Sequence, residues 1–247
     1  MQKQEYKVME NADQKHWWWL GRQRILETLL LKVSTPQNMW EILDFGAGTG
    51  ANTPMLQRFG NVTALDMDKG CVKLIKDKYG IEAVLWKYPD KLDKKFDLIL
   101  LADVLEHLED DRGAANWIHA HLKDGGLALV SVPAHRYLWT QMDDIAEHFR
   151  RYEKNELLSV LSQFTPVKIT YYNFFLFPVK VIFTLAVNFM RKFSLNDKSR
   201  TYNDVAISDK MSIPNEIMKQ VLYLEAKIIS YVSLPYGVSL VALVRKK

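Results

Sequence analysis

The chain has 247 residues, of which 48% are hydrophobic and 25% are charged, an ordinary composition for a globular protein that predicts one domain with an elaboration. Its net charge of +4 is too small to indicate a nucleic-acid-binding protein, and we expect no nucleic-acid partner. The single cysteine, Cys71, excludes an internal disulfide and fits a reducing compartment. No basic segment followed by an apolar one opens the chain, so we expect no secretion signal and a cytoplasmic location.

Positive charge is concentrated in the C-terminal part of the chain. Residues 1–150 contain 19 Lys and Arg against 22 Asp and Glu, whereas residues 151–247 contain 14 against 7. A basic surface there can face an anionic partner, such as a membrane surface or a phosphorylated substrate. The alternative is an ordinary solvated basic face.

Strand-like and helix-like segments alternate along the chain after a first helix predicted over residues 14–32. We predict strands near residues 40–45, 62–66, 82–86, 96–102, 126–132, 167–172 and 239–244. We predict helices near residues 50–59, 68–79, 109–122 and 153–164, and a turn at Gly125 and Gly126 into the fifth strand. This alternation predicts an α/β fold with a doubly wound, mostly parallel seven-stranded sheet that carries helices on both faces.

The first strand runs into a glycine-rich turn, with Gly46, Gly48 and Gly50 at alternate positions. Such a turn lets a ligand approach the backbone closely, and the following helix presents free N–H groups. Asp66 ends the second strand 20 residues after Gly46, the position of an acid that holds ribose hydroxyls. The spacing predicts a nucleoside-type cofactor, and it fits both NAD and S-adenosylmethionine.

Two features favour S-adenosylmethionine. Asp44 stands two residues before Gly46, where a carboxylate suits an ammonium group and would repel a pyrophosphate. In addition, a long segment precedes the first strand, whereas a dinucleotide-binding domain usually begins near its first strand.

Four segments carry a family resemblance, covering about Trp40 to Pro133: D-F-G-A-G-T-G, A-L-D-M-D, F-D-L-I-L-L-A-D-V-L-E-H-L and L-K-D-G-G-L-A-L-V-S-V-P. In order and spacing they resemble the motif series of class I S-adenosylmethionine-dependent methyltransferases, which have a Rossmann-like fold. The segments His16–Arg22, Val132–Trp139 and Glu147–Tyr152 are similar to a bacterial subgroup, some members of which are encoded among genes for surface polysaccharides. The resemblance implies methyl transfer to a small or sugar- or lipid-linked acceptor, with S-adenosylhomocysteine as product.

Thirteen residues are predicted to hold the cofactor. Asp44 faces the methionine ammonium, Asp66 the ribose, and Arg22 the methionine carboxylate, for which Arg24 is the alternative. The tryptophans at positions 17–19 either close over the adenine or sulfonium or pack in the core. Trp86 is a candidate to stack on the adenine. The full set is Trp18, Arg22, Asp44, Gly46, Ala47, Gly48, Gly50, Asp66, Met67, Ala102, Asp103, Val104 and His107.

Three histidines are candidate general bases, because imidazole titrates near neutral pH. His107 follows the fourth strand, His135 follows the fifth, and His148 lies further downstream. The alternative for His107 is a structural role in shaping the cofactor pocket. We expect His16 to order the tryptophan segment and the remaining two histidines, His119 and His121, to lie at the surface.

A metal site is the less favoured interpretation of the acidic segment before His148. Asp144 and His148 stand four residues apart, as on one helical face, but Arg150 and Arg151 follow at once. Salt bridges explain this pattern more simply, so we predict no metal site.

More than 60 residues separate the last two predicted strands. We expect two helices there, over 178–193 and 214–231, packed as a hairpin over the active-site edge and joined by a polar loop over 194–212. The first is apolar except for a narrow polar stripe and is too short to span a membrane. It predicts either peripheral contact with the inner membrane face through residues 174–193, or a core or homodimer contact.

These predictions divide the chain into four parts: an N-terminal helical cap (1–39), a cofactor-binding core (40–173), a helical insertion or lid (174–237) and a final core strand (238–247). Methyl transfer to an oxygen atom is the predicted activity. One alternative is an NAD-dependent oxidoreductase, since Tyr223 and Lys227 have the spacing Y-x-x-x-K. The other is a non-catalytic methyltransferase-like module that binds a membrane or a partner.

Overall fold

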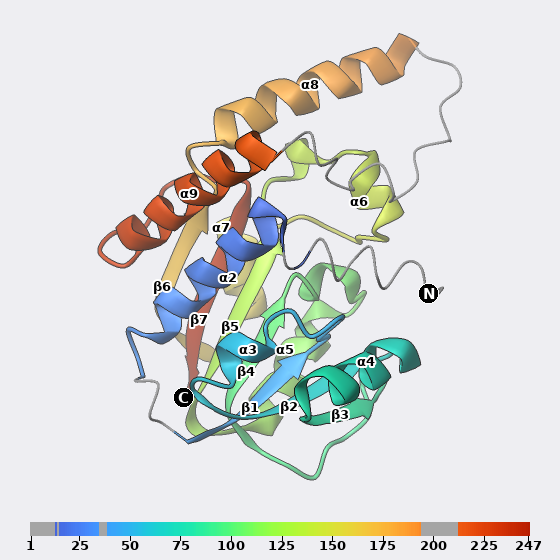
Figure 1. Ribbon diagram of the computed structural model, residues 1–247, viewed down its shortest axis with the longest axis vertical. Helices are drawn as coiled ribbons and strands as arrows, with labels where there is room; N and C mark the ends of the chain where they lie inside the picture. Colours follow the sequence, from blue (N-terminus) through green and yellow to red (C-terminus); the bar gives the residue numbers. More distant parts are fainter. Residues whose placement is uncertain (1–12, 14, 35–38, 194–211) are drawn as a thin grey trace.

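The computed structural model describes residues 13, 15–34, 39–193 and 212–247 and is built on one twisted sheet (Figure 1). The predicted loop over 194–212 therefore lies almost entirely outside the described residues. The strands are β1 (Trp40–Phe45), β2 (Gly60–Asp66), β3 (Glu82–Leu85), β4 (Phe96–Ala102), β5 (Leu122–Pro133), β6 (Phe164–Tyr172) and β7 (Ser239–Lys246). Their order in the sheet is β3-β2-β1-β4-β5-β7-β6, and β7 runs antiparallel to both of its neighbours. The predicted α/β fold with seven strands is confirmed.

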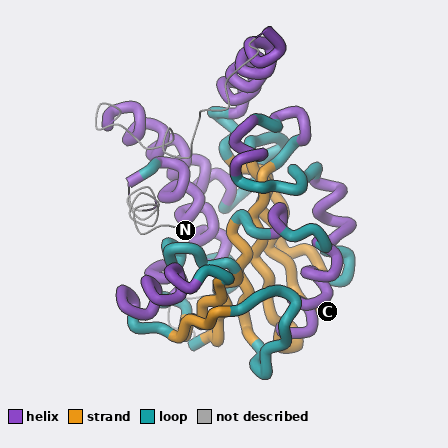
Figure 2. The backbone as a smooth tube through the Cα atoms, turned by 90° about the vertical axis from the view of Figure 1, so that its right-hand side faces the viewer, coloured by secondary structure: helices purple, strands orange, loops and turns teal. Residues whose placement is uncertain are grey.

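Helices cover both faces of the sheet, as Figure 2 shows. One face carries α2 (Trp17–Leu30), α4 (Lys69–Tyr79) and α9 (Ser212–Ile229), and the other carries α5 (Asp111–His121) and α7 (Lys154–Val160). The shorter helices are α3 (Thr53–Leu56), α6 (Gln141–Ile145) and the 3-10 turns η1 (Leu105–His107) and η2 (Arg136–Leu138). Alternate residues of β1 belong to opposite layers: Ile42 packs under α2, whereas Leu43 packs under α5. Burial on both faces explains why the central strands are continuous apolar runs.

Two predicted boundaries were wrong. Strand β5 begins at Leu122, ahead of the glycine pair, because Leu122 already pairs with Phe96 of β4 before a register shift. The helix predicted over 50–59 is reduced to the single turn α3, because the chain turns from Ala47 to Gly50 through backbone hydrogen bonds that are not helical. The glycine-rich turn is therefore followed by a single helical turn, and the expected long helix with free N–H groups at its start does not follow it.

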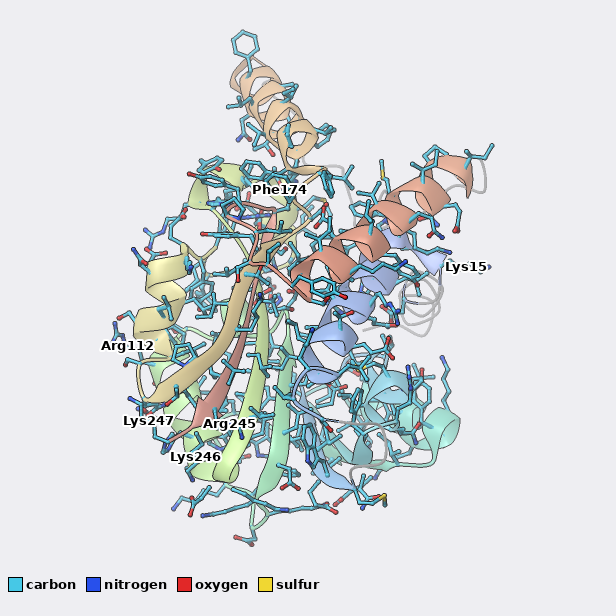
Figure 3. The ribbon with its side chains drawn as sticks, turned by 90° about the vertical axis from the view of Figure 1, so that its left-hand side faces the viewer. Lys15, Arg112, Phe174, Arg245, Lys246 and Lys247 are labelled. Carbon is cyan, nitrogen blue, oxygen red and sulfur yellow. The ribbon has the colours of Figure 1, made fainter. Side chains whose placement is uncertain are left out.

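The two helices of the insertion do not form the expected hairpin. Helix α9 lies along α2, whereas α8 (Phe177–Phe193) projects from the molecule and contacts η2 (Figures 1 and 3). The Asn215 side chain of α9 accepts a hydrogen bond from the backbone N–H of Trp17 at 2.8 Å and donates one to the carbonyl of Lys15. The insertion thus holds the start of the N-terminal helix.

Helix α8 carries an apolar face that the described part of the chain leaves exposed. Val179, Ile182, Phe183 and Leu185 are all more than half exposed. Of the described helices, none combines the length and the apolar character that crossing a membrane requires.

The basic residues at the end of the chain do not gather at the carboxyl edge of the parallel strands. Because β7 is antiparallel, Arg245, Lys246 and Lys247 lie at the opposite end of the sheet from Phe174, as Figure 3 shows. Their side chains donate hydrogen bonds to the backbone carbonyls of Gly125, Leu122 and Ser162. This part of the C-terminal charge is tied to the start of β5 and to the turn before β6.

We expect Gly21→Ala to lower the free energy of unfolding, although alanine is the better helix former by about 1 kcal/mol. A Cβ at Gly21 would lie 2.1 Å from Cδ1 of the buried Leu222, so the α2–α9 contact has no room for it. Overpacking of this kind costs roughly 1–3 kcal/mol, which urea denaturation measures. In the control, Gly21→Ala combined with Leu222→Ala is expected to cost less than the two single substitutions together. Strict additivity of the two would contradict the clash.

Candidate active site

The carboxyl ends of the parallel strands place the predicted acids at one edge of the sheet. Asp44 of β1 aligns with Ala64 of β2 and with Leu100 of β4. Asp66 ends β2, and Asp103 follows the last residue of β4. In open α/β sheets, ligands bind at this edge, where the strand order reverses between β1 and β4.

The glycine-rich turn has two glycines required by packing and one that faces open space. Gly46, Gly48 and Gly50 have φ angles of 71°, 57° and 79°. A Cβ would lie 2.8 Å from the Val104 side chain at Gly46 and 2.8 Å from the Tyr79 ring at Gly50, but at Gly48 no described atom lies within 4 Å. Gly48 is therefore the position at which the backbone is open to a ligand.

Asp66 braces this turn. Its carboxylate accepts hydrogen bonds from the backbone N–H groups of Gly48, at 2.7 Å, and Asp68, at 2.8 Å. Burial raises the pKa of Asp66, although these two hydrogen bonds oppose the shift. A carboxylate has about four acceptor positions, so Asp66 can hold the turn and still accept a ligand hydroxyl.

Asp44 is a buried carboxylate with an incomplete set of partners. It is 1% exposed, and its Oδ2 atom has no hydrogen-bond partner among the described residues. Burial raises its pKa to about 7, against the opposing charge of Arg22. A buried acceptor without a donor is costly, and an ammonium group is the donor with the matching charge. The orphaned oxygen and the open Gly48 together fit the amino acid end of S-adenosylmethionine.

Arg22 reaches the same edge from α2. It is 7% exposed, and its Nη1 atom lies 2.5 Å from Oδ2 of Asp103, whose Oδ1 accepts a hydrogen bond from Ser131. This burial places Arg22 in the interior of the molecule and not at its surface. Its Nε atom lacks a partner within the described ranges, so one donor stays available for a carboxylate. The alternative, Arg24, instead pairs with Glu27 in its own helix.

The aromatic residues divide between the site and the core. The ring of His16 accepts a hydrogen bond from the backbone N–H of Trp18, which confirms that His16 orders this segment. Trp18 stacks on Tyr172 with the ring centroids 5.8 Å apart. Trp86 is buried against Phe45 and donates its indole N–H to a backbone carbonyl, so these contacts lend no support to the prediction that it stacks on adenine.

His107 and His148 come together, although 41 residues separate them in the chain. Their ring centroids lie 4.7 Å apart, and the N–H of Phe149 donates to the carbonyl of Glu106, which fixes the downstream loop on η1. Burial, and next the proximity of His148, lower the pKa of His107. Nδ1 of His148 lies 3.0 Å from Oδ1 of Asp143.

His135 has a different set of neighbours. Its Nδ1 lies 3.1 Å from Oε2 of Glu153, and its ring stacks on Tyr171 with centroids 5.1 Å apart and planes at 6°. Its Nε2 is buried and has no hydrogen-bond partner in the part of the chain that the structure describes. The residue adopts a φ of 61° at the turn after β5. Glu153 fixes the ring and leaves a basic nitrogen free.

The predicted pairing in the acidic segment was wrong in detail. Helix α6 ends at Ile145, so Asp144 and His148 do not share a helical face, and Asp144 instead accepts the indole N–H of Trp139. The preceding residue, Asp143, binds His148 and both Nε and Nη2 of Arg151. Burial would raise the pKa of Asp143, but these partners outweigh it and hold that pKa at about 2. The predicted salt bridges are confirmed.

One residue of chemical interest, Glu106, escaped the sequence analysis. Glu106 is fully buried, and neither carboxylate oxygen has a hydrogen-bond partner among the described atoms. Burial, and then the charge of Asp103, raise the pKa of Glu106 well above its ordinary value. The signal was present, since an acid inside an apolar strand-and-turn segment is unusual. His121 is also buried, stacked on Trp117, so the prediction of a surface position was wrong.

Comparisons with known proteins agree with this geometry. The model of a family described as "Methyltransferase domain" matches residues 18–164. Malonyl-[acyl-carrier protein] O-methyltransferase 2 of Ilyobacter polytropus is 27% identical over 120 residues, so the match spans 45% of this chain and 46% of that protein. The chain thus spans about half the length of this curated relative.

Two solved structures share the fold. A coclaurine N-methyltransferase bound to N-methylheliamine and S-adenosylhomocysteine has a TM-score of 0.57 at 16% identity, covering 91% of this chain and 72% of its own. The N-methyltransferase NodS from Bradyrhizobium japonicum, in complex with S-adenosylhomocysteine, has a TM-score of 0.51 at 16% identity, covering 89% of this chain and 85% of its own. At these identities the likeness shows the fold alone.

The family match sets aside the oxidoreductase alternative, for which Tyr223 and Lys227 were the only specific sign. Both residues lie in α9, the helix that packs along α2. The matched range instead contains the glycine-rich turn, the acids at the strand ends and the buried Arg22. The sheet order and the family match together show that the chain belongs to the methyltransferase-domain family, and the orphaned Asp44 fits S-adenosylmethionine as a methyl donor.

Proposed function

We propose that the enzyme transfers the methyl group to an oxygen atom of a small or sugar- or lipid-linked acceptor. The observation that carries this proposal is His135, whose Nε2 has no hydrogen-bond partner among the described residues and whose Nδ1 faces Glu153. A hydroxyl acceptor must lose its proton on transfer, and an imidazole oriented by a carboxylate takes it. The relative from Ilyobacter polytropus, an O-methyltransferase by name, supports an oxygen acceptor.

Transfer from a sulfonium is an in-line displacement with a good neutral leaving group, so alignment supplies most of the rate. Well-oriented reactions gain about 7–11 kcal/mol in this way. In this proposal Asp44 binds the methionine ammonium, Gly48 admits the cofactor, Asp66 binds the ribose and Arg22 faces the carboxylate. The other proposed cofactor contacts are Trp18, Gly46, Ala47, Gly50, Met67, Ala102, Asp103, Val104 and His107.

His107 and His148 stay candidates for the base, but their closeness to each other and to the buried Glu106 favours a role as metal ligands. The acceptor atom is tested by incubating the enzyme with carbon-13-methyl-labelled S-adenosylmethionine and fractions of a cell extract. Carbon-13 NMR distinguishes a methyl group on oxygen from one on nitrogen or carbon. We expect an O-methyl product, and an N- or C-methyl product would refute the proposed acceptor.

We expect Asp66→Ala to weaken S-adenosylhomocysteine binding by an order of magnitude or more. The substitution removes the ribose acceptor and leaves the N–H of Gly48 without its partner, at a cost of about 1–3 kcal/mol for that group. Isothermal titration calorimetry measures the affinity. Asp77→Ala, in the exposed part of α4, is the matched control and should bind as the wild type does. An unchanged affinity for Asp66→Ala would remove this residue from the site.

We further propose that the enzyme is cytoplasmic and that residues 174–193 rest on the inner membrane face as part of a lid. The exposed apolar face of α8 supports this, with a homodimer contact as the competing explanation. We expect Ile182→Ser combined with Phe183→Ser to abolish co-sedimentation with anionic liposomes, because two large exposed apolar side chains are lost. If the wild type stays in the supernatant and sediments as a dimer in ultracentrifugation, the membrane proposal is wrong.

A further inference from the structure

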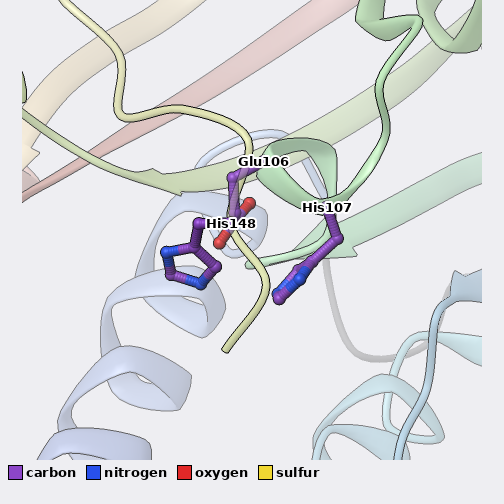
Figure 4. A group of neighbouring side chains, drawn as sticks. All are labelled: Glu106, His107 and His148. Atoms are coloured by element: carbon purple, nitrogen blue, oxygen red, sulfur yellow. The ribbon is translucent and has the colours of Figure 1, made fainter. Parts of the chain in front are cut away.

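We propose that Glu106, His107 and His148 form a binding site for one divalent transition-metal cation. Glu106 and His107 come from η1, directly after β4, and His148 comes from the loop after α6. Figure 4 shows the three side chains converging. One potential ligand atom from each lies within 4.8 Å of the other two. The proposal concerns cation binding and does not depend on which atom accepts the methyl group.

The described part of the chain supplies no hydrogen-bond partner for the Glu106 carboxylate. The side chain is 0% exposed, and its two oxygens lack hydrogen-bond partners anywhere in the described ranges. Buried carboxylates in proteins are normally paired, hydrogen-bonded or bound to a metal. A proton alone does not resolve the problem, because the resulting O–H would itself need an acceptor. A cation between Glu106 and the two imidazoles satisfies the carboxylate.

The two histidines are already oriented as metal ligands usually are. A ligating histidine generally uses its second ring nitrogen to bind a carboxylate or a backbone carbonyl. Nδ1 of His148 faces Oδ1 of Asp143, which leaves Nε2 for coordination. The ring of His107 hydrogen-bonds to the backbone of Ala146. Asp143 is in turn held by Arg151 and by the backbone N–H of Thr140, so the ring of His148 has a rigid support.

Two imidazoles and one carboxylate select the class of ion. Imidazole suits Zn²⁺, Cu²⁺, Fe²⁺ and Ni²⁺, whereas Ca²⁺, Mg²⁺ and Mn²⁺ prefer oxygen ligands. With bonds of about 2.0–2.2 Å, neighbouring ligands of a tetrahedral ion lie ~3.3 Å apart. The widest of the three separations must therefore shorten by at most about 1.5 Å, which side-chain rotation can supply. Three protein ligands leave at least one position open for water or another oxygen.

The position of the cluster places the cation at the functional edge of the sheet. Glu106 stands three residues after Asp103, at the carboxyl end of β4, which lies beside β1 and its Asp44. An imidazole whose lone pair binds a metal cannot also take a proton. The proposal therefore gives His107 and His148 a binding role and leaves His135 as the base. It replaces the sequence-based prediction that the chain has no metal site.

The test uses the full chain, stripped with a chelator and titrated with Co²⁺, whose visible absorption reports nitrogen and oxygen ligands. We expect one Co²⁺ per chain. Glu106→Gln and His148→Gln should each weaken binding at least as much as loss of a supporting residue does, that is, by about 10- to 100-fold. His119→Gln, which alters a histidine outside the cluster, is the matched control and should bind as the wild type does.

Calorimetry with S-adenosylhomocysteine checks in parallel that each variant is folded. A second measurement needs only the wild-type chain and so does not depend on whether the variants fold. Bound Co²⁺ should shift the NMR signals of two imidazole rings outside the normal range. A wild-type chain that takes up no Co²⁺, shifted signals from fewer than two histidines, or unchanged binding in the folded His148→Gln chain would each overturn the proposal. A chain that binds Co²⁺ yet methylates nitrogen would refute only the oxygen acceptor.

Discussion

Asp44→Asn is expected to weaken S-adenosylhomocysteine binding about 100-fold at pH 8. The carboxylate is buried, and its Oδ2 has no partner in the described part of the chain, which supports the proposal that it binds the methionine ammonium. Breaking a buried ion pair by removing one partner costs about 3–5 kcal/mol. A loss of roughly 3 kcal/mol of binding free energy corresponds to about 100-fold weaker binding. Calorimetry measures the loss. Asp124→Asn, which alters a side chain that is 95% exposed, should leave the affinity unchanged.

The same carboxylate predicts how cofactor affinity depends on pH. Its pKa of about 7 in the free enzyme means that a proton must leave before the ammonium binds. Affinity should therefore fall as the pH drops below 7, by up to about tenfold per unit, and should level off above it. The asparagine variant should lack this dependence. If it keeps the wild-type pH profile, Asp44 is not the group that pairs with the cofactor.

Asp44 should also lower the stability of the free enzyme at pH 8. Its pKa is about 7 in the folded state against 3.8 in a model peptide, so between these values the folded chain binds more protons than the unfolded one. Stability from this group therefore falls as the pH rises through that window, by about 4 kcal/mol at most. We expect Asp44→Asn to unfold at a higher temperature than the wild type at pH 8. Weaker cofactor binding and a higher unfolding temperature in Asp44→Asn would together show that Asp44 serves cofactor binding at the expense of stability.

His135→Asn is expected to lower turnover by about 100- to 10,000-fold while leaving cofactor affinity unchanged. General-base catalysis contributes this range, and the substitution removes the group that we favour for the task. Asparagine suits the site because, like histidine, it tolerates the positive φ of 61° there, which alanine does not. Turnover is measured with the acceptor found in the labelling screen. S-adenosylhomocysteine affinity is measured on the same preparations.

A substitution of Glu153 tests whether this residue orients the His135 ring for catalysis. Glu153→Gln keeps a hydrogen-bond acceptor beside Nδ1 but removes the charge, so it should reduce turnover less than His135→Asn does and shift the pH profile of the reaction. A purely structural role for His135 predicts a different result. In that case the asparagine variant would lose stability and cofactor affinity together, and its turnover at saturating cofactor would stay near that of the wild type.

The sequence predicted the fold well where a strand is buried on both faces. Strands β1 and β4 lie at the predicted residues, because short continuous apolar runs bounded by polar residues are typical of strands that are buried on both faces. It failed where tertiary pairing overrides local preference. Lys123, Asp124 and the following glycines resemble a turn, yet β5 includes them because β4 pairs with Leu122. The helix predicted after Gly50 failed for the same reason, since the turn must close on β2.

The sequence alone was enough to predict the cofactor and the acids proposed to face it, because glycines at fixed spacing after a strand and a carboxylate before them follow from backbone geometry and charge. Only the tertiary structure decided which side chains meet. Arg22 pairs with Asp103 across 81 residues, His148 reaches His107 across 41, and Glu106 is left in the interior without a partner among the described residues. These contacts depend on how the loops after β4 and α6 pack together, and pairings between distant segments leave no periodic signal in the chain itself.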